Sequence, residues 1–236
     1  MFCHFASVPR SWWRFDLLLL PLIIGVLAGC AATESHQAVE TQKVATYRTA
    51  YDGPRYALVI SNFANSSSYQ RGAFSDGVDR LGGQAKTILK THLQQTNRFS
   101  VVDRDNLETI SQEAELRGVE QKLKGAEVAI TGAVTEFGRR ETGDRQLFGI
   151  LGRAKSQLAY SKVALNVVDT TTGEVIHSTQ GAGEYQLDNR EVVGFGGTAG
   201  YDATLNGKVL NLAITEAVEQ LVVDLENGLW SPTGEG

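Results

Sequence analysis

The sequence predicts an α+β domain in which a mostly antiparallel sheet packs against three helices and carries two long β-hairpin excursions. Two patterns support this fold class. Apolar residues alternate with small or polar ones at 126–134 and 161–169, which is typical of strands. Near the C-terminus, at 209–225, apolar residues recur at helical spacing. We place the folded domain at residues 55–232, followed by a short tail at 233–236.

The chain opens with an export signal that ends in a lipid-attachment sequence. Two arginines precede an apolar run of 11 residues, Leu17–Leu27, and small residues follow the run. The tetrad Leu27-Ala28-Gly29-Cys30 resembles a lipobox, in which the cysteine is lipidated and becomes the new N-terminus. We therefore predict that residues 1–29 are removed and that acyl chains on Cys30 anchor the protein to a membrane.

A single transmembrane helix is the alternative for this apolar run. A spanning helix needs about 20 apolar residues, however, and Asp16 and Pro21 fit poorly in one. Ala31 follows Cys30 at the position where an aspartate would retain a lipoprotein in the inner membrane. This favours the outer membrane, with the domain facing the periplasm. Residues 30–54 are polar and have no consistent period, so we expect them to form a flexible tether.

Composition excludes several kinds of site. The only cysteines are Cys3, in the signal, and Cys30, so the mature chain has no disulfide, cysteine nucleophile or thiolate metal site. The formal charge of −5 argues against nucleic acid as a partner. Outside the signal the histidines are His36, His92 and His177, which lack the spacing of metal ligands. We therefore expect neither a metal nor a cofactor.

The first half of the domain alternates short strands with helices. An apolar strand, Tyr56–Ile60, is followed by a loop at 62–77 that is rich in Ser, Asn and Gly yet contains three aromatic residues. A loop of that length is usually functional or disordered. The pattern then predicts a helix at 81–95, a strand at 99–102 and a second helix that starts at the capping-box-like segment Asp105–Glu108, runs to Leu116 and stops at Gly118.

Turn and cap signals set the remaining boundaries. We interpret Asp105 and Glu108 as capping residues of the second helix rather than as a catalytic carboxylate pair. Thr172-Gly173 joins two strands as a hairpin turn. An Asn-Gly pair ends the last helix, after which Leu229 and Trp230 are expected to pack on the core.

Two glycine-rich stretches, Thr135–Tyr160 and Ser178–Asp202, are long for the connections of a compact domain. Tilted strands of about 9–11 residues can cross a bilayer, so these hairpins can be membrane-spanning. They can equally be solvent-exposed hairpins or loops. In the first stretch, charged residues fall on both faces of the predicted strand, Arg139 on one and Arg140 on the other. A membrane hairpin must keep such charges in a water-filled lumen or near its tip. In the second stretch, residues 188–191 are typical of a turn between two strands.

Several segments match a known family in order and spacing. These segments are Arg98–Arg104, Leu147–Ile150, Lys162–Asp169, Thr171–Ile176 and Asn227–Trp230. Together they resemble the CsgG/HfaB family, whose founding member is the outer-membrane lipoprotein that exports curli fibre subunits. The resemblance covers nearly all of the predicted domain.

The resemblance implies a periplasmic α+β domain that assembles as a homo-oligomeric ring. Each subunit would contribute two hairpins to one shared transmembrane barrel, whose closure removes the strand edges. It also implies that a loop after the first strand narrows the pore, with Tyr69, Ala73 and Phe74 as the candidate residues. Alanine stands at position 73 where the family has asparagine. The alternative is that Tyr69 and Phe74 pack against the first helix of their own subunit.

These features predict a non-enzymatic outer-membrane lipoprotein that forms or assists a pore for the export or assembly of surface polypeptides. The alternative is a periplasmic lipoprotein of the same domain type that forms no pore and binds an envelope partner, such as a peptidoglycan synthase. We expect no enzyme, because the glycine run at 194–200 lacks both the lysine of a P-loop and the spacing of a dinucleotide-binding fold.

Overall fold

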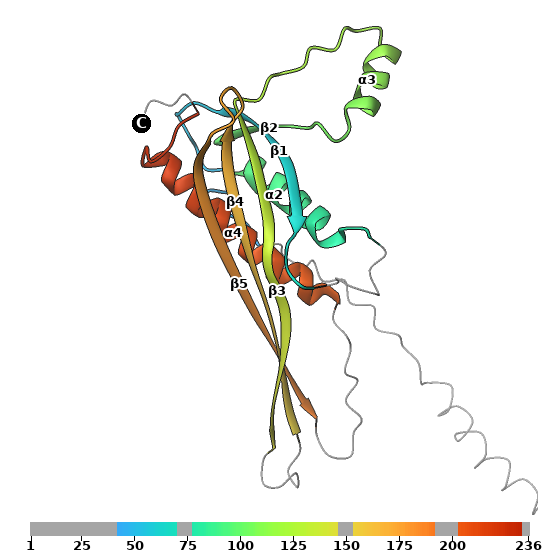
Figure 1. Cartoon of the computed structure of the whole chain (residues 1–236), viewed down its shortest axis with the longest axis vertical. Coiled ribbons are helices and arrows are strands. Elements are labelled where there is room, and N and C mark those ends of the chain that lie inside the picture. The colour runs from blue at the N-terminus through green and yellow to red at the C-terminus, as the bar shows by residue number, and fades with distance from the viewer. Residues whose placement is uncertain (1–41, 70–76, 146–152, 192–202, 233–236) are drawn as a thin grey trace, which may run out of the picture. The chain divides into compact units, whose positions relative to one another are not determined.

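The computed structural model describes residues 42–69, 77–145, 153–191 and 203–232, which contain three helices and five strands. In chain order these elements are β1 (Tyr56–Asn65), α2 (Arg80–Gln95), β2 (Phe99–Val102), α3 (Leu107–Leu116), β3 (Val128–Arg145), β4 (Arg153–Asp169), β5 (Val175–Glu191) and α4 (Ala203–Glu226) (Figure 1). The predicted α+β class is confirmed. The three strands that follow α3 are much longer than the alternating pattern indicated.

The five strands form one sheet in the order β2-β1-β3-β4-β5. The antiparallel pairings expected from the hairpin turn are present between β3 and β4 and between β4 and β5. β1, however, pairs in parallel with both β2 and β3, so the sheet is mixed, although its long ladders are the antiparallel ones. The parallel pair β1–β2 follows from α2, because a crossover helix returns the chain to lay the next strand in the same direction.

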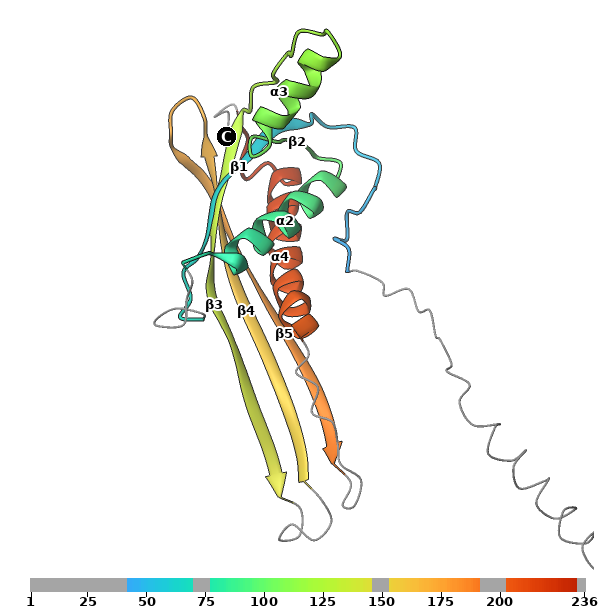
Figure 2. The same ribbon diagram turned by 90° about the vertical axis from the view of Figure 1, so that its right-hand side faces the viewer.

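Helices α2 and α4 contact each other and cover one face of the sheet (Figure 2). The core lies between these helices and the strands, where Leu58, Ile130 and Leu165 from three different strands are fully buried. The fully buried residues of α4 follow helical spacing: Val209, Leu210, Ala213, Ile214, Ala217, Val218, Leu221 and Val222. The apolar stripe predicted for the last helix is therefore its sheet-facing side.

β5 and α4 approach each other closely at two glycines. A Cβ atom added at Gly181 would overlap the carbonyl oxygen of Ala213 and lie 2.5 Å from the amide nitrogen of Ala217. One added at Gly183 would lie 2.5 Å from the carbonyl oxygen of Val209. Backbone atoms of the helix thus occupy the space of a side chain, and these two positions in the second glycine-rich stretch serve helix packing.

The segment before β1 lies on the folded domain instead of forming part of the tether. Val44 is 2% exposed and belongs to the core, and the Ala45 amide donates to Oε1 of Glu219 at 2.8 Å. The domain therefore begins near Gln42 rather than at residue 55. One buried valine among polar residues produces no periodic pattern, so nothing in the sequence indicated that the segment around Val44 packs on the domain.

Arg98 fastens the same segment to the end of α4. Its side chain is almost fully buried, donates from Nε to Oε1 of Glu226 at 2.8 Å and from Nη1 to Oγ1 of Thr49 at 2.5 Å. The guanidinium also lies over the Tyr51 ring, 4.7 Å from its centroid. Burial raises the pKa of the Tyr51 phenol, which stays neutral beside the carboxylate of Glu226.

The chain after α4 folds back through Trp230, which is 4% exposed and donates from Nε1 to the Leu221 carbonyl at 3.2 Å. The predicted burial of Trp230 is confirmed. That of Leu229 is wrong, because Leu229 is 66% exposed. Gly228, with φ +70°, reverses the chain just before these residues and directs only the tryptophan inwards.

Helix α3 stands apart from the sheet and from the other helices (Figures 1 and 2), and it has no buried residue. It ends at Leu116 as predicted, but it begins at Leu107, and the capping interpretation of Asp105 is wrong. The N-cap residue is Asn106, and the Asp105 carboxylate accepts a hydrogen bond from Nζ of Lys86 at 2.6 Å. A charge-assisted bond to lysine is stronger than a bond to a backbone amide, so the carboxylate turns away from the helix. Glu108 lies in the first turn, where a carboxylate favours the helix dipole.

Candidate functional site

Strands β3, β4 and β5 continue together well beyond the rest of the sheet (Figure 1). The pairing of β1 with β3 ends at Asn65↔Val134, whereas β3 and β4 stay paired from Glu136 to Arg145. β5 accompanies β4 over the same length, up to the pair Arg153↔Glu191. We call this projecting part, residues 135–145, 153–161 and 183–191, the ribbon.

The ribbon revises the expectation of two separate hairpins. The arms of the first excursion are β3 and β4, and its connection at 146–152 lies outside the described residues. The turn predicted at 188–191 is wrong, because these residues continue the β4–β5 ladder, with Asp188 opposite Ser156 and Arg190 opposite Ala154. The remainder of the second excursion, 192–202, is also outside the described residues.

A β-bulge marks the point where the ribbon leaves the sheet. The register shifts between Val134 and Glu136, and the carboxylate of Glu136 pairs with Lys162 at 3.0 Å. Beyond this point the described strands leave two edges without a strand neighbour, one along β3 from residue 135 and one along β5. Bulges bend a strand and increase its twist, which is typical of a sheet that changes direction.

The stem of the loop after β1 is held rigidly beside the bulge. The side chain of Asn65 accepts from the Ser67 hydroxyl at 2.6 Å and donates to the Tyr69 carbonyl at 2.8 Å. The Asp79 carboxylate receives the Asn65 amide at 2.7 Å and the Gly82 amide at 2.7 Å, so it joins the end of β1 to the start of α2. The two ends of the loop are thereby fixed to each other.

Of the three candidate pore residues, only Tyr69 lies within the described residues. Its half-buried ring packs on Phe137 at the root of the ribbon, with centroids 4.6 Å apart and planes tilted by 55°. Tyr69 therefore contacts β3 of its own chain. Ala73 and Phe74 lie outside the described residues, as does the lipidation candidate Cys30.

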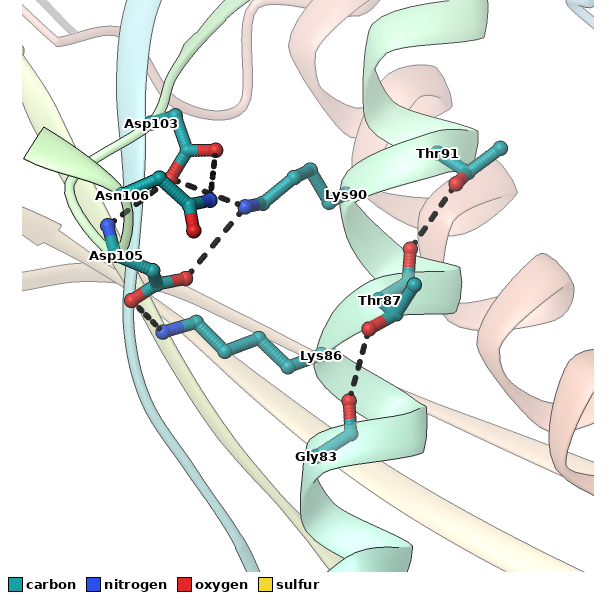
Figure 3. Close-up of polar contacts among 8 residues, drawn as sticks. All are labelled: Gly83, Lys86, Thr87, Lys90, Thr91, Asp103, Asp105 and Asn106. Carbon is teal, nitrogen blue, oxygen red and sulfur yellow. Dashed lines mark hydrogen bonds and ion pairs between the residues drawn. The ribbon is translucent and has the colours of Figure 1, made fainter. Parts of the chain in front are cut away.

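A second polar cluster anchors the connection between β2 and β3, which includes α3 and which we call the arm (residues 103–127). Nζ of Lys86 and Nζ of Lys90, on α2, pair with Asp105 and Asp103 at 2.6 and 3.3 Å (Figure 3). The Asn106 amide donates to Asp103 and holds the pKa of this carboxyl below its ordinary value, and the hydrogen bond from Lys86 does the same for Asp105. Both carboxylates are thus ionised anchors for the base of the arm.

The histidines of the described residues contact polar side chains of α4. His92, on α2, contacts Oδ1 of Asn211 at 2.7 Å, and His177, on β5, lies 2.9 Å from Oδ2 of Asp224, so both histidines are engaged by α4. No group of His, Cys, Asp and Glu in the described part of the chain could hold a metal ion. Among the helices that the structure describes, none combines the length and apolarity required to cross a membrane.

The sequence over residues 37–234 matches the family model described as the curli production assembly/transport component CsgG. The chain belongs to the CsgG family. The resemblance drawn from its motifs is thereby confirmed. A candidate lipoprotein of Neisseria meningitidis serogroup B is 62% identical over 206 residues, which cover 87% of this chain and 92% of the relative.

Two solved structures are similar to this chain at low sequence identity. The PelC dodecamer from Paraburkholderia phytofirmans is 16% identical with a TM-score of 0.33, and the match covers 72% of this chain and 92% of the PelC chain. The lipoprotein GNA1162 from Neisseria meningitidis is 14% identical with a TM-score of 0.35, and the match covers 74% of this chain and 100% of that lipoprotein. These superpositions are loose, so membership of the CsgG family rests on the sequence matches.

Proposed function

We propose that this CsgG-family chain is a non-enzymatic outer-membrane lipoprotein, anchored through Cys30 with its domain in the periplasm. Copies assemble as a ring that forms or assists a pore for the export of surface polypeptides. The ribbon is the observation that supports this proposal most directly. Its two edges present rows of backbone donors and acceptors, and such edges need further strands, from the rest of the chain or from another copy.

The ribbon has the length that a membrane barrel needs. From Glu136 to Arg145 β3 rises by roughly 31 Å at about 3.4 Å per residue, which exceeds the roughly 25 Å of the apolar band of an outer-membrane barrel. Charges restrict where that band can lie. Arg139 and Glu141 lie on one face of β3 and Arg140 lies on the opposite face. The charges on one of these faces therefore point into a water-filled lumen, and the charges on the other face lie outside the apolar band.

The stem of the loop after β1 supports a constriction near the root of the ribbon. Because Tyr69 packs on Phe137, the loop that contains Ala73 and Phe74 starts beside the strands that would form the barrel. In a ring, every copy brings such a loop to the same axis. Several aromatic side chains around one axis make an opening that is wide enough for an extended chain and too narrow for a folded one.

Single-channel recording in planar bilayers tests this function on the lipidated protein purified in detergent. The wild type should conduct, and Phe74→Ala should raise the unitary conductance. Ser68→Ala, an exposed polar residue of the same loop stem, is the matched control and should leave the conductance unchanged. A protein that never conducts, and whose ribbon is cleaved by protease from the periplasmic side of intact membranes, would instead be the non-pore lipoprotein that binds an envelope partner.

A further inference from the structure

The arm exposes apolar side chains that its own domain does not cover. Ile110 and Leu116 on α3 are exposed, and so are Val119 and Leu123 on the limb that returns to β3. Leu116 reaches 81% exposure at the end of the helix. Exposed apolar side chains that gather on one small projecting element are typical of a surface that binds another protein.

The arm is held in a defined position. Its two limbs are joined by Arg104, which donates from Nη2 to the Lys124 carbonyl at 2.5 Å. Its base is fixed to α2 by the ion pairs of Lys86 and Lys90 (Figure 3). Gly118, with φ +64°, ends α3 and turns the chain into the returning limb. A preorganised projection loses little conformational entropy when a partner binds it.

A second exposed apolar patch lies at the other edge of the sheet. Val175 at the start of β5, Val223 on α4 and Leu229 after α4 are all exposed. Each is within two residues of the contacts of His177 with Asp224 and with Trp230, which join the end of α4 to β5. We call these three residues and the last turns of α4 (residues 216–226) the α4 end.

The charges of the arm and the α4 end are complementary. The returning limb at 117–124 has three basic residues, Arg117, Lys122 and Lys124, against one glutamate. No ion pair within the described residues engages these three cations. The α4 end has four carboxylates and no basic residue, and the C-terminus of a helix adds partial negative charge. Two of the carboxylates contact side chains of their own chain, Glu226 with Arg98 and Asp224 with His177, whereas Glu216 and Glu219 accept backbone amides.

The two surfaces lie on opposite flanks of the domain, at the same end. The arm follows β2, which is one edge of the sheet, whereas α4 packs on β5, the other edge. In Figure 1 α3 lies at the upper right and the C-terminal end of α4 at the upper left, while the ribbon points down. A contact between opposite flanks is head-to-tail, and repeated head-to-tail contacts close into a ring when the rotation permits. All ribbons then project from the same side of the ring.

We propose that the arm of one copy docks on the α4 end of the next copy. Leu116, Val119 and Leu123 cover the valines and the leucine of the neighbour, and the basic limb faces its carboxylates. This inference rests on the proposed function only for the ring of copies, and it holds whether or not the ribbon crosses a membrane.

Photo-crosslinking on the full lipidated protein in detergent tests the contact. A benzoylphenylalanine in place of Leu116 should give a covalent dimer, with its crosslink mapped by mass spectrometry to residues 175–178 or 216–230. The same probe in place of Thr91, on the exposed side of α2, should not give this product. Crosslinks from Leu116 that map elsewhere, or none at all, would overturn the proposal.

A charge at the contact provides a second measurement. Leu116→Asp should convert the ring to monomers in sizing experiments while leaving the melting temperature of the monomer unchanged, because Leu116 is exposed in the single chain. Thr109→Asp on the same helix is the control and should keep the ring. A ring that survives Leu116→Asp overturns the docking contact but leaves the proposed function intact. A wild type that is already monomeric overturns both the contact and the proposed ring.

Discussion

Replacing Gly181 by alanine should destabilise the domain, because α4 has no room to accept a side chain there. The added Cβ would lie 2.5 Å from the Ala217 amide nitrogen and still nearer to the Ala213 carbonyl oxygen, whereas ordinary contact begins at 3.4 Å, so the helix must move by at least about 0.9 Å or β5 must bend away. Overpacking of this kind typically costs about 1–3 kcal/mol. For a domain of this size the melting temperature should then fall by roughly 2–12 °C.

Thermal unfolding of the mature protein in detergent, followed by circular dichroism, measures the effect. Gly83→Ala on α2 is the matched control, because nothing lies within 4 Å of its added Cβ. Alanine is favoured over glycine in a helix by about 0.5–1 kcal/mol, so this control should raise the melting temperature slightly. If Gly181→Ala melted at or above the wild-type temperature, α4 could not lie against β5 as described.

Three further changes test the anchor, the buried arginine and the base of the arm. Cys30→Ser should leave an unprocessed precursor at the inner membrane that incorporates no labelled fatty acid; an unlabelled wild type free in the periplasm would contradict the lipid anchor. Arg98→Ala should cost about 2 kcal/mol in chemical denaturation, since the partner Glu226 is partly exposed, and Arg98→Lys should cost less. Asp103 and Asp105 have depressed pKa values in the folded state, so their stabilisation is complete above about pH 4, the unfolded value, and is lost as pH falls through the folded values. Hydrogen exchange in the arm, corrected for intrinsic rates, should rise below that pH, and exchange that stays constant would show that the ion pairs do not hold it.

Much of the fold followed from local pattern. The apolar spacing of Val209 to Leu225 predicted α4 because a helix that is buried on one side must repeat its apolar residues at that spacing. β2 matched its predicted bounds, and α3 matched its predicted end at Leu116, since both are short elements bounded by polar turn residues. The α+β class rested on these elements and on the hairpin turn at Gly173, whereas the family resemblance rested on the order and spacing of short segments between Arg98 and Trp230.

The ribbon could not be predicted in the same way. Strands that have polar residues on both faces, as at Glu141 and Thr142, show no alternation, and only the ladder to β4 reveals them as strands. The anchoring of Asp105 was missed for a related reason, because its partner Lys86 is far away in the sequence. The contact of Tyr69 with Phe137 in the ribbon was also missed. It depends on the β-bulge between Val134 and Glu136, and no pattern in the sequence predicted that bulge.

The two open edges of the ribbon also affect how readily the chain aggregates before it assembles. A copy that has not yet assembled carries strand edges that could pair with any other extended polypeptide, which is how aggregates begin. Charged residues on exposed strands discourage such pairing, and the ribbon has Arg140 on its β3 edge and Glu184 on its β5 edge. We therefore expect these charges to act as gatekeepers during transit, at some cost to the apolar character of the strands. Attachment to a membrane then confines the copies to a plane, where they meet in a common orientation.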